Sequence, residues 1–190
     1  MTILPILEIG HPTLRQRARE LTTEELAAPE TQRLIDEMIE TMRDAAGAGL
    51  AANQIGRPLR IAVAEVDHNP RYPYKPPIPL TVFVNPVIEP LDEELVAINE
   101  GCLSVPDLRG EVPRHVNVRV RYLDRDGNEQ DEVKCGLTAG TFQHEVDHLD
   151  GVLFCDRANP RTLATWEQFE RFHRAAFVER ITEFVERVGS

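Results

Sequence analysis

Two histidines and a glutamate stand close together in the run His144-Glu145-Val146-Asp147-His148. Side chains four positions apart on a helix project from one face, so His144 and His148 can hold one metal ion. Glu145 stands beside the first histidine, where a carboxylate can accept a proton from a water that the ion activates. The alternative is a helix with two solvated histidines and an acidic neighbour. The spacing favours a hydrolytic metal site.

A catalytic metal site needs a third protein ligand and one position open for water. In one branch of the zinc peptidases the pattern continues with a glycine and then a third histidine; Gly151 is in place here, but Phe154 stands where that histidine should be. Another branch uses a downstream glutamate. Glu167 and Glu170 are the candidates, and we expect both on the solvated face of the last helix. The third ligand should therefore lie elsewhere.

A cysteine upstream offers that ligand. Cys102 lies in the run Glu-Gly-Cys-Leu-Ser at 100–104, and a thiolate is a good ligand for iron(II) or zinc. Cys135 ends an expected strand and Cys155 follows Leu-Phe, so we expect both in the core. A third segment, Gly-Ala-Gly-Leu-Ala-Ala-Asn-Gln at 47–54, is rich in glycine. It is not a phosphate loop, because its second glycine is not followed by Lys and Ser or Thr.

Composition limits the classes of function. The chain has 190 residues, enough for one domain, which we expect to span 1–190. Its formal net charge of −11 argues against a nucleic-acid surface. Three cysteines are an odd number and argue against a disulfide framework. We find no apolar run long enough for a membrane helix and no signal peptide, so we expect no membrane association and a cytoplasmic protein.

Hydrophobic spacing and turn residues predict the elements that position these side chains. We expect a helix at 28–46, strands at 60–66, 80–84, 86–98 and 116–123, a hairpin through the turn at 124–127 to a strand at 129–135, a helix at 137–149 closed by Gly151, and a last helix at about 163–187. The proline-rich stretch 69–79 should be a surface loop. The order of helix, strands and helix predicts an α+β domain with antiparallel sheet around a helix.

Together the three segments resemble the peptide deformylase family. Its three motifs stand unbroken and in order at residues 47–54, 100–104 and 143–148, and residues 10–15 are similar to its proline-containing opening. The likeness runs to about residue 156. It implies an α+β fold with antiparallel β-sheets around a central metal-binding helix, and an additional C-terminal helix.

The resemblance also implies an activity and a metal. Family members hydrolyse the N-formyl group from the N-terminal formylmethionine of nascent polypeptides and release formate. By resemblance, Cys102, His144 and His148 hold one divalent ion, generally iron(II), with zinc, nickel or cobalt able to replace it. Glu145 would be the general base. The side-chain amide of Gln54 and the backbone N–H of Leu103 would stabilise the oxyanion.

The substrate site is implied in the same way. The peptide would lie as an added strand along Gly47, Ala48 and Gly49, with Gly101 also in contact. The pocket for the first side chain would be lined by Gly47, Ala48, Leu137, Gly140 and Thr141. Many relatives have bulkier residues at 48, 140 and 141. We expect either a pocket that is roomier or slightly more polar than usual, or one in which neighbouring side chains refill the space.

Two other functions stay open at this point. A zinc peptidase would share the histidine helix, but it would need a downstream ligand and would have no use for Gln54 or Cys102. A catalytically silent binding module would keep the fold alone. The expected partner is a nascent formyl-methionyl peptide. Some relatives dock on the ribosome near the exit tunnel through a basic C-terminal helix, but the last helix here mixes glutamates and arginines.

Overall fold

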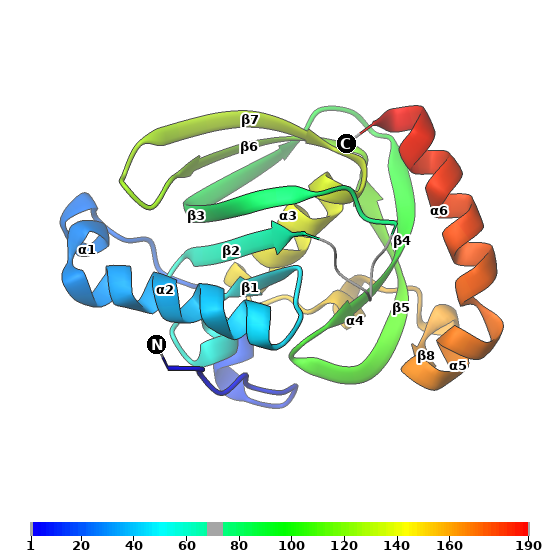
Figure 1. Cartoon of the computed structure of the whole chain (residues 1–190), viewed down its shortest axis with the longest axis horizontal. Helices are drawn as coiled ribbons and strands as arrows, with labels where there is room; N and C mark the ends of the chain where they lie inside the picture. The colour runs from blue at the N-terminus through cyan, green and yellow to red at the C-terminus, as the bar shows by residue number, and fades with distance from the viewer. Residues whose placement is uncertain (1, 68–73, 190) are drawn as a thin grey trace.

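The computed structural model describes residues 2–67 and 74–189 (Figure 1). The helices are α1 (Thr23–Ala27), α2 (Pro29–Asp44), α3 (Gly136–Leu149), α4 (Phe154–Arg157), α5 (Trp166–Phe172) and α6 (Arg174–Val188). The strands are β1 (Gly49–Ala51), β2 (Ile61–Val66), β3 (Ile78–Pro90), β4 (Leu95–Cys102), β5 (Val105–His115), β6 (Asn117–Leu123), β7 (Glu129–Cys135) and β8 (Ala164–Thr165). None of the described helices has the length and apolar character needed to cross a membrane.

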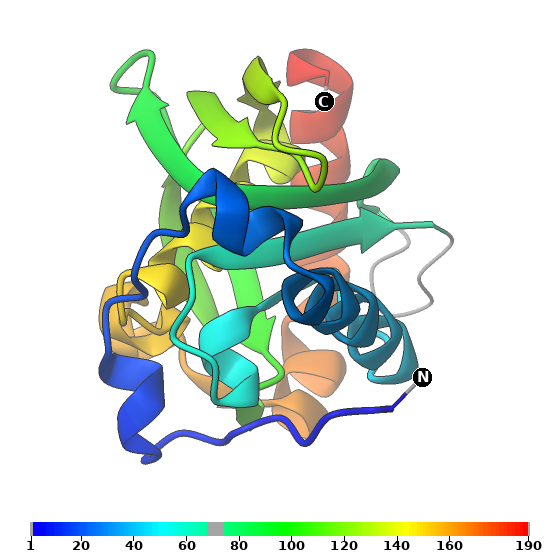
Figure 2. The same cartoon turned by 90° about the vertical axis from the view of Figure 1, so that its left-hand side faces the viewer.

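Two antiparallel sheets surround α3. In the described part of the chain, a five-stranded sheet has the order β1-β2-β3-β6-β7 and a three-stranded sheet has the order β4-β5-β8. Helix α3 contacts strands of both sheets, while α2 packs on β1 and β2. Figures 1 and 2 show α3 enclosed at the centre and α6 standing beside β4 at the outside of the molecule. The predicted α+β arrangement is confirmed.

Strand β2 forms the boundary between two apolar layers. Its residues alternate, so that Ile61 and Val63 pack with the apolar face of α2, while Ala62 and Ala64 pack in the cluster that contains Phe142 of α3. All four are fully buried. The small alanine side chains leave room for a helix to lie close to the sheet. This close packing fixes the height of α3 above β1 and β2.

Helix α3 is buried on nearly all sides. It begins at Gly136, whose φ of +56° lets the chain turn sharply out of β7. Twelve of its fourteen residues are buried. Because the helix is buried to this extent, its polar side chains must find partners inside the protein. The histidine pair lies at the C-terminal end of this helix.

Strand β3 differs from the prediction at both ends. It runs without interruption to Pro90, and the chain then turns before β4 begins at Leu95, so the separate strands predicted at 80–84 and 86–98 are wrong. A bulge between Val84 and Val87 accommodates Asn85, whose φ is +52°. Ile78 and Pro79 already belong to β3, and residues 69–73 of the predicted loop lie outside the described residues.

Strand β5 is absent from the elements predicted from the sequence. Pro106 and Pro113 interrupt the region between 98 and 116, and its apolar residues do not alternate regularly, so it carries no clear strand pattern. In the structure β5 pairs with β4 along its whole length. Strand β8 pairs with β5 at only two positions. Strand β5 therefore forms in the three-stranded sheet although it contains both prolines.

The predicted single helix at 163–187 is wrong. Ala164 and Thr165 form β8, and α5 is separated from α6 at His173, which is exposed and has a φ of −121°. Residues eight apart on a continuous helix lie about 12 Å apart along the axis. The break instead brings the rings of Phe169 and Phe177 to a centroid distance of 6.0 Å, so both are buried in one cluster.

Candidate metal centre and active site

Three side chains from two elements converge at the C-terminal half of α3. Cys102 ends β4, and His144 and His148 lie on α3; one ligand atom from each lies within 4.8 Å of the others. The Sγ of Cys102 is 3.2 Å from the Nε2 of His148. The predicted metal site is confirmed as a cluster. Glu167 and Glu170, the downstream candidates, are exposed on α5.

The donor set fits a divalent transition metal. One thiolate and two imidazoles suit iron(II) or zinc and leave a coordination position for water or substrate. The Nδ1 of His144 lies 2.8 Å from the Oε2 of Glu100, so the Nε2 of this ring is left to face the cluster. A carboxylate bonded to the far nitrogen of a ligating histidine orients the ring and raises its basicity.

A chain of buried charges holds Glu100 in place. Arg114 donates to both oxygens of Glu100, at 2.7 and 2.9 Å, and to Oδ2 of Asp147 at 2.6 Å. Arg157 donates to both oxygens of Asp147 at 2.8 Å. Burial opposes the ionisation of Glu100, but the charge and hydrogen bonds of Arg114 outweigh it and hold the pKa of this carboxyl at about 2. Glu100 is therefore a permanent carboxylate behind His144.

Glu145 is buried next to the ligand cluster. Among the described residues, its Oε2 has no hydrogen-bond partner. Its other oxygen faces Gly49, where an added Cβ would lie 2.3 Å away. Burial raises the pKa of Glu145 to about 7, and the charges of His144 and Lys75 oppose that rise. A carboxylate with such a pKa can accept and return a proton near neutral pH.

Gln54 presents its amide nitrogen to Cys102. The short 3-10 helix Ala52–Ile55 carries Gln54, whose Oε1 accepts a hydrogen bond of 2.9 Å from the N–H of Ala51. This contact orients the amide, so that Nε2 lies 3.1 Å from the Oγ of Ser104 and 3.6 Å from the Sγ of Cys102. Leu103 lies between Cys102 and Ser104 in the sequence, and its side chain points toward Gly47.

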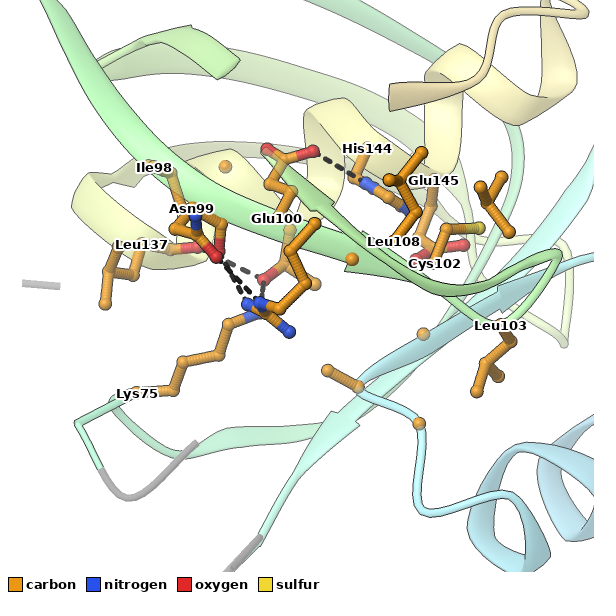
Figure 3. A pocket seen from close by; sticks show the side chains of 18 of the residues that line it. Lys75, Ile98, Asn99, Glu100, Cys102, Leu103, Leu108, Leu137, His144 and Glu145 are labelled. Carbon is orange, nitrogen blue, oxygen red and sulfur yellow. Dashed lines mark hydrogen bonds and ion pairs between the residues drawn. The ribbon is translucent and has the colours of Figure 1, made fainter. Parts of the chain in front are cut away.

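A single cavity of about 610 Å³ brings the predicted site residues together. His148 is the exception, since it lies behind the cavity wall and is almost fully buried. The predicted residues that line the cavity are Gly47, Ala48, Gly49, Gln54, Gly101, Cys102, Leu103, Leu137, Gly140, Thr141, His144 and Glu145. Figure 3 shows Cys102 and Glu145 at one end of the cavity and Leu137 at the other.

Sequence reasoning missed several residues of this cavity. Lys75, Ile98, Asn99, Arg109 and Trp166 also line it. Ile98 belonged to a predicted strand without a role in the site; in the structure its Cδ1 lies 2.5 Å from where a Cβ at Gly140 would be. Ile98 therefore occupies the space that a larger residue at 140 would take. Arg109 is buried against the Trp166 ring and carried no local motif.

Comparison with known proteins identifies the family. The family model described as polypeptide deformylase matches residues 3–164. A peptide deformylase 2 from a Nostoc species is 45% identical over 155 residues, which cover 82% of this chain and 86% of the relative. This chain belongs to the polypeptide deformylase family. A peptide deformylase 1 from Nitrosomonas europaea is 43% identical over 157 residues, with coverages of 83% and 88%.

Solved deformylase structures share the fold. A class I type b peptide deformylase from Acinetobacter baumannii, in a crystal structure with bound Met-Ala-Ser, has a TM-score of 0.79 and 39% identity, and the match covers 82% of this chain and 98% of that chain. A deformylase from Synechococcus elongatus in complex with actinonin has a TM-score of 0.73 and 32% identity, with coverages of 98% and 86%. Helices α5 and α6 lie beyond the region that the family model matches.

Membership of the deformylase family assigns the reaction. The chain is a metallohydrolase that removes the N-formyl group from nascent peptides. The zinc peptidase alternative required a ligand downstream of His148, whereas the third member of the cluster is Cys102, upstream.

Proposed function

We propose that iron(II) is the metal used in the cell and that Glu145, Gln54 and Leu103 carry out the hydrolysis around it. The observation that carries this proposal is the placement of a buried carboxylate and an oriented amide beside one thiolate and two imidazoles. A bound divalent ion supplies a Lewis acid that makes water a nucleophile near neutral pH. The protein residues then handle the proton and the developing charge.

Glu145 is the proton carrier in this proposal. A water molecule attacks the formyl carbon, and Glu145 takes one proton from it. The same carboxyl returns that proton to the amide nitrogen as the C–N bond breaks, which yields formate and a free amine. Its burial beside Gly49 supports the assignment, because the carboxylate is shielded from bulk water.

Gln54 and Leu103 are the proposed oxyanion donors. The formyl oxygen gains negative charge as the carbon is attacked, and donors already aimed at that position stabilise it. The amide of Gln54 is fixed by the N–H of Ala51, with its nitrogen on the side of Cys102. Leu103 follows Cys102 directly and lines the same cavity. Loss of one such donor typically costs about 10²–10³ in rate.

The peptide would bind along β1. This strand pairs only with β2 and forms the edge of the five-stranded sheet in the described part of the chain, so its free edge can accept an added strand. Gly47, Ala48 and Gly49 would make these contacts from one side and Gly101 from the other. Leu137, Gly140 and Thr141 would then line the first side-chain pocket. Met-Ala-Ser bound to the Acinetobacter relative supports methionine as the first residue.

Nascent formyl-methionyl chains are the proposed substrates, and their source is the ribosome. Helix α6 gives little support to docking on an anionic surface, because its arginines pair within the protein. Arg180 contacts Glu111 at 2.6 Å, and Arg187 contacts Glu94 at 3.5 Å. Cosedimentation of the protein with ribosomes would test binding itself.

Formate release from formyl-Met-Ala-Ser by protein purified without oxygen tests the reaction. We expect release with iron bound, and loss of both iron and activity in Cys102→Ala. Air should inactivate the iron form, because a thiolate beside iron(II) is open to oxidation. A folded, metal-loaded sample that releases no formate would overturn the proposal. Zinc bound in protein from iron-replete cells would overturn the metal assignment alone.

A further inference from the structure

Lys75 places a positive charge inside the substrate cavity. It is one of only two lysines in the sequence, and its Nζ donates a hydrogen bond of 3.0 Å to the Oγ of Thr141. The hydroxyl of Thr141 in turn donates to the carbonyl of Leu137 at 3.1 Å. Because that hydrogen is committed to the helix, the hydroxyl oxygen faces the ammonium group as an acceptor. Figure 3 shows Lys75 reaching into the cavity from the chain that precedes β3.

The C-terminal helix holds this segment against the cavity. Tyr74 packs edge-on against Phe177 of α6, with ring centroids 5.3 Å apart, and Tyr74 also lines the cavity. Phe177 itself is buried. The residue directly before Lys75 is therefore anchored to a packed helix, which limits the positions open to the lysine side chain.

The ammonium group lies beside Thr141, one of the residues proposed to line the first side-chain pocket. Thr141 precedes His144 by three residues on α3, which corresponds to about 4.5 Å along the helix. Leu137 lies about one turn further, and Ile98 covers Gly140 between them. A side chain of the length of methionine can span this distance from the reacting amide. Its end would meet an aliphatic wall of Leu137 and Ile98 on one side and the Lys75–Thr141 pair on the other.

We propose that Lys75 is a specificity-determining residue, which enables the pocket to accept a first side chain that ends in a strong hydrogen-bond acceptor, with methionine sulfoxide as the substrate class. This inference rests on the proposed function of the site. A thioether sulfur is a weak acceptor, whereas the sulfoxide oxygen formed by oxidation of methionine is a strong one. The reaction is the same hydrolysis: water adds to the formyl carbon, the C–N bond breaks and the sulfoxide is unchanged.

An ammonium group also favours such an acceptor energetically. A purely aliphatic pocket would have to remove water from the sulfoxide oxygen without replacing its hydrogen bonds. Lys75 replaces one of them with a charge-assisted bond, which is stronger than a neutral one. The competing possibility is that Lys75 only occludes the pocket and is displaced by every substrate alike. If Lys75 recognises an acceptor, its effect depends on the chemistry of the first side chain. If Lys75 only occludes the pocket, its effect is the same for every first side chain.

Three tripeptide substrates separate these possibilities: formyl-Met-Ala-Ser, its methionine sulfoxide form, and the norleucine form, which has no acceptor. We expect Lys75→Met to lower the ratio of kcat/KM for sulfoxide over norleucine by about tenfold or more. Lys75→Arg keeps a cationic donor and should restore most of that ratio. The matched control is Lys134→Met, because Lys134 lies on β7 next to Glu132 and does not line the cavity.

Each result decides the question. A ratio that falls in Lys75→Met but holds in Lys75→Arg and Lys134→Met supports the proposal. A ratio that is unchanged in Lys75→Met, including the case in which both substrates react faster, overturns it. Metal content and thermal unfolding of each variant verify that the site is intact. Failure of the parent protein to release formate from the methionine substrate would instead refute the proposed function.

Discussion

Glu145 and Gly49 illustrate how one residue depends on another in this site. The carboxylate of Glu145 can lie against β1 only because position 49 has no side chain, since an added Cβ would be 2.3 Å from Oε1. The resulting burial removes water from the carboxylate and raises its pKa to about 7. Gly49 on β1 thus contributes to the chemistry of a residue on α3.

Replacement of Glu145 by glutamine should separate metal binding from catalysis. Glutamine has the same shape but cannot accept a proton, so we expect kcat to fall by about 10²–10⁴. Metal content should equal that of the parent, because Glu145 is not one of the three ligands. Metal analysis and formate release on the same preparation measure both. A variant that turns over at the parental rate would disprove the role of Glu145 as proton carrier.

Tyr122 should make the stability of the protein depend on alkaline pH. Burial raises the pKa of this phenol well above its ordinary value, and the nearby Glu132, which accepts its hydrogen bond at 3.0 Å, adds to the effect. The folded state therefore favours the un-ionised phenol of Tyr122. Its contribution is complete below about pH 10, the pKa in the unfolded chain, and is lost as pH rises further.

Urea unfolding from pH 8 to 11 measures this dependence. The free energy of unfolding of the parent should fall above pH 10, and Tyr122→Phe should fall less steeply, because phenylalanine has no proton to lose. Equal slopes for the two proteins would show that Tyr122 is not the group responsible.

At the scale of elements, one arginine joins two strands to a helix. Arg114 lies on β5, Glu100 on β4 and Asp147 on α3, and the guanidinium contacts both carboxylates. Arg114→Met would leave the buried Glu100 without its arginine and Asp147 with Arg157 as its remaining arginine partner, so we expect a loss of about 3–5 kcal/mol in the free energy of unfolding. Arg119→Met is the control, because the Arg119–Asp131 pair is exposed on β6 and β7. Similar losses for both variants in urea titrations would contradict the structural role of Arg114.

Phe177 should connect the C-terminal helix to the active site. It is buried in the cluster with Ile98 and Leu137, and it contacts Tyr74 beside Lys75. Phe177→Ala should cost about 3–5 kcal/mol in stability because it creates a cavity. It should also raise KM for formyl peptides, since the chain next to the cavity loses its anchor. Phe172→Ala, at a residue that is 62% exposed, should change neither quantity much. Steady-state kinetics measures KM and urea unfolding measures stability. An unchanged KM in Phe177→Ala would show that α6 does not affect the active site.

At the scale of the whole molecule, the metal should stabilise the fold. Its ligands come from β4 and α3, so a bound ion links the two elements that carry the active site. Anything that binds only the native state stabilises it, by about 4 kcal/mol at a thousandfold excess over Kd. We expect a chelator to lower Tm in the parent and to leave Tm unchanged in Cys102→Ala. Identical Tm values for the parent with and without chelator, after verified metal removal, would refute this linkage.

The sequence alone determined the features that depend on local spacing. The histidine pair at i and i+4 predicted a metal-binding helix, and the alternation of Val118, Val120 and Tyr122 predicted β6. The motif around Cys102 predicted the third ligand. These predictions succeeded because the period of a helix or strand is present in neighbouring residues, and the metal ligands carry chemistry that few other residue types share.

The tertiary structure decided what depends on contacts between distant segments. The pairing of β4 with the proline-containing β5, the break at His173 and the entry of Lys75 into the cavity all lack a local pattern. Packing set each of them: Phe169 and Phe177 can share one cluster only if the helix breaks, and Lys75 reaches Thr141 because Tyr74 packs on α6. Such contacts follow from the shapes of surfaces that exist only in the folded protein.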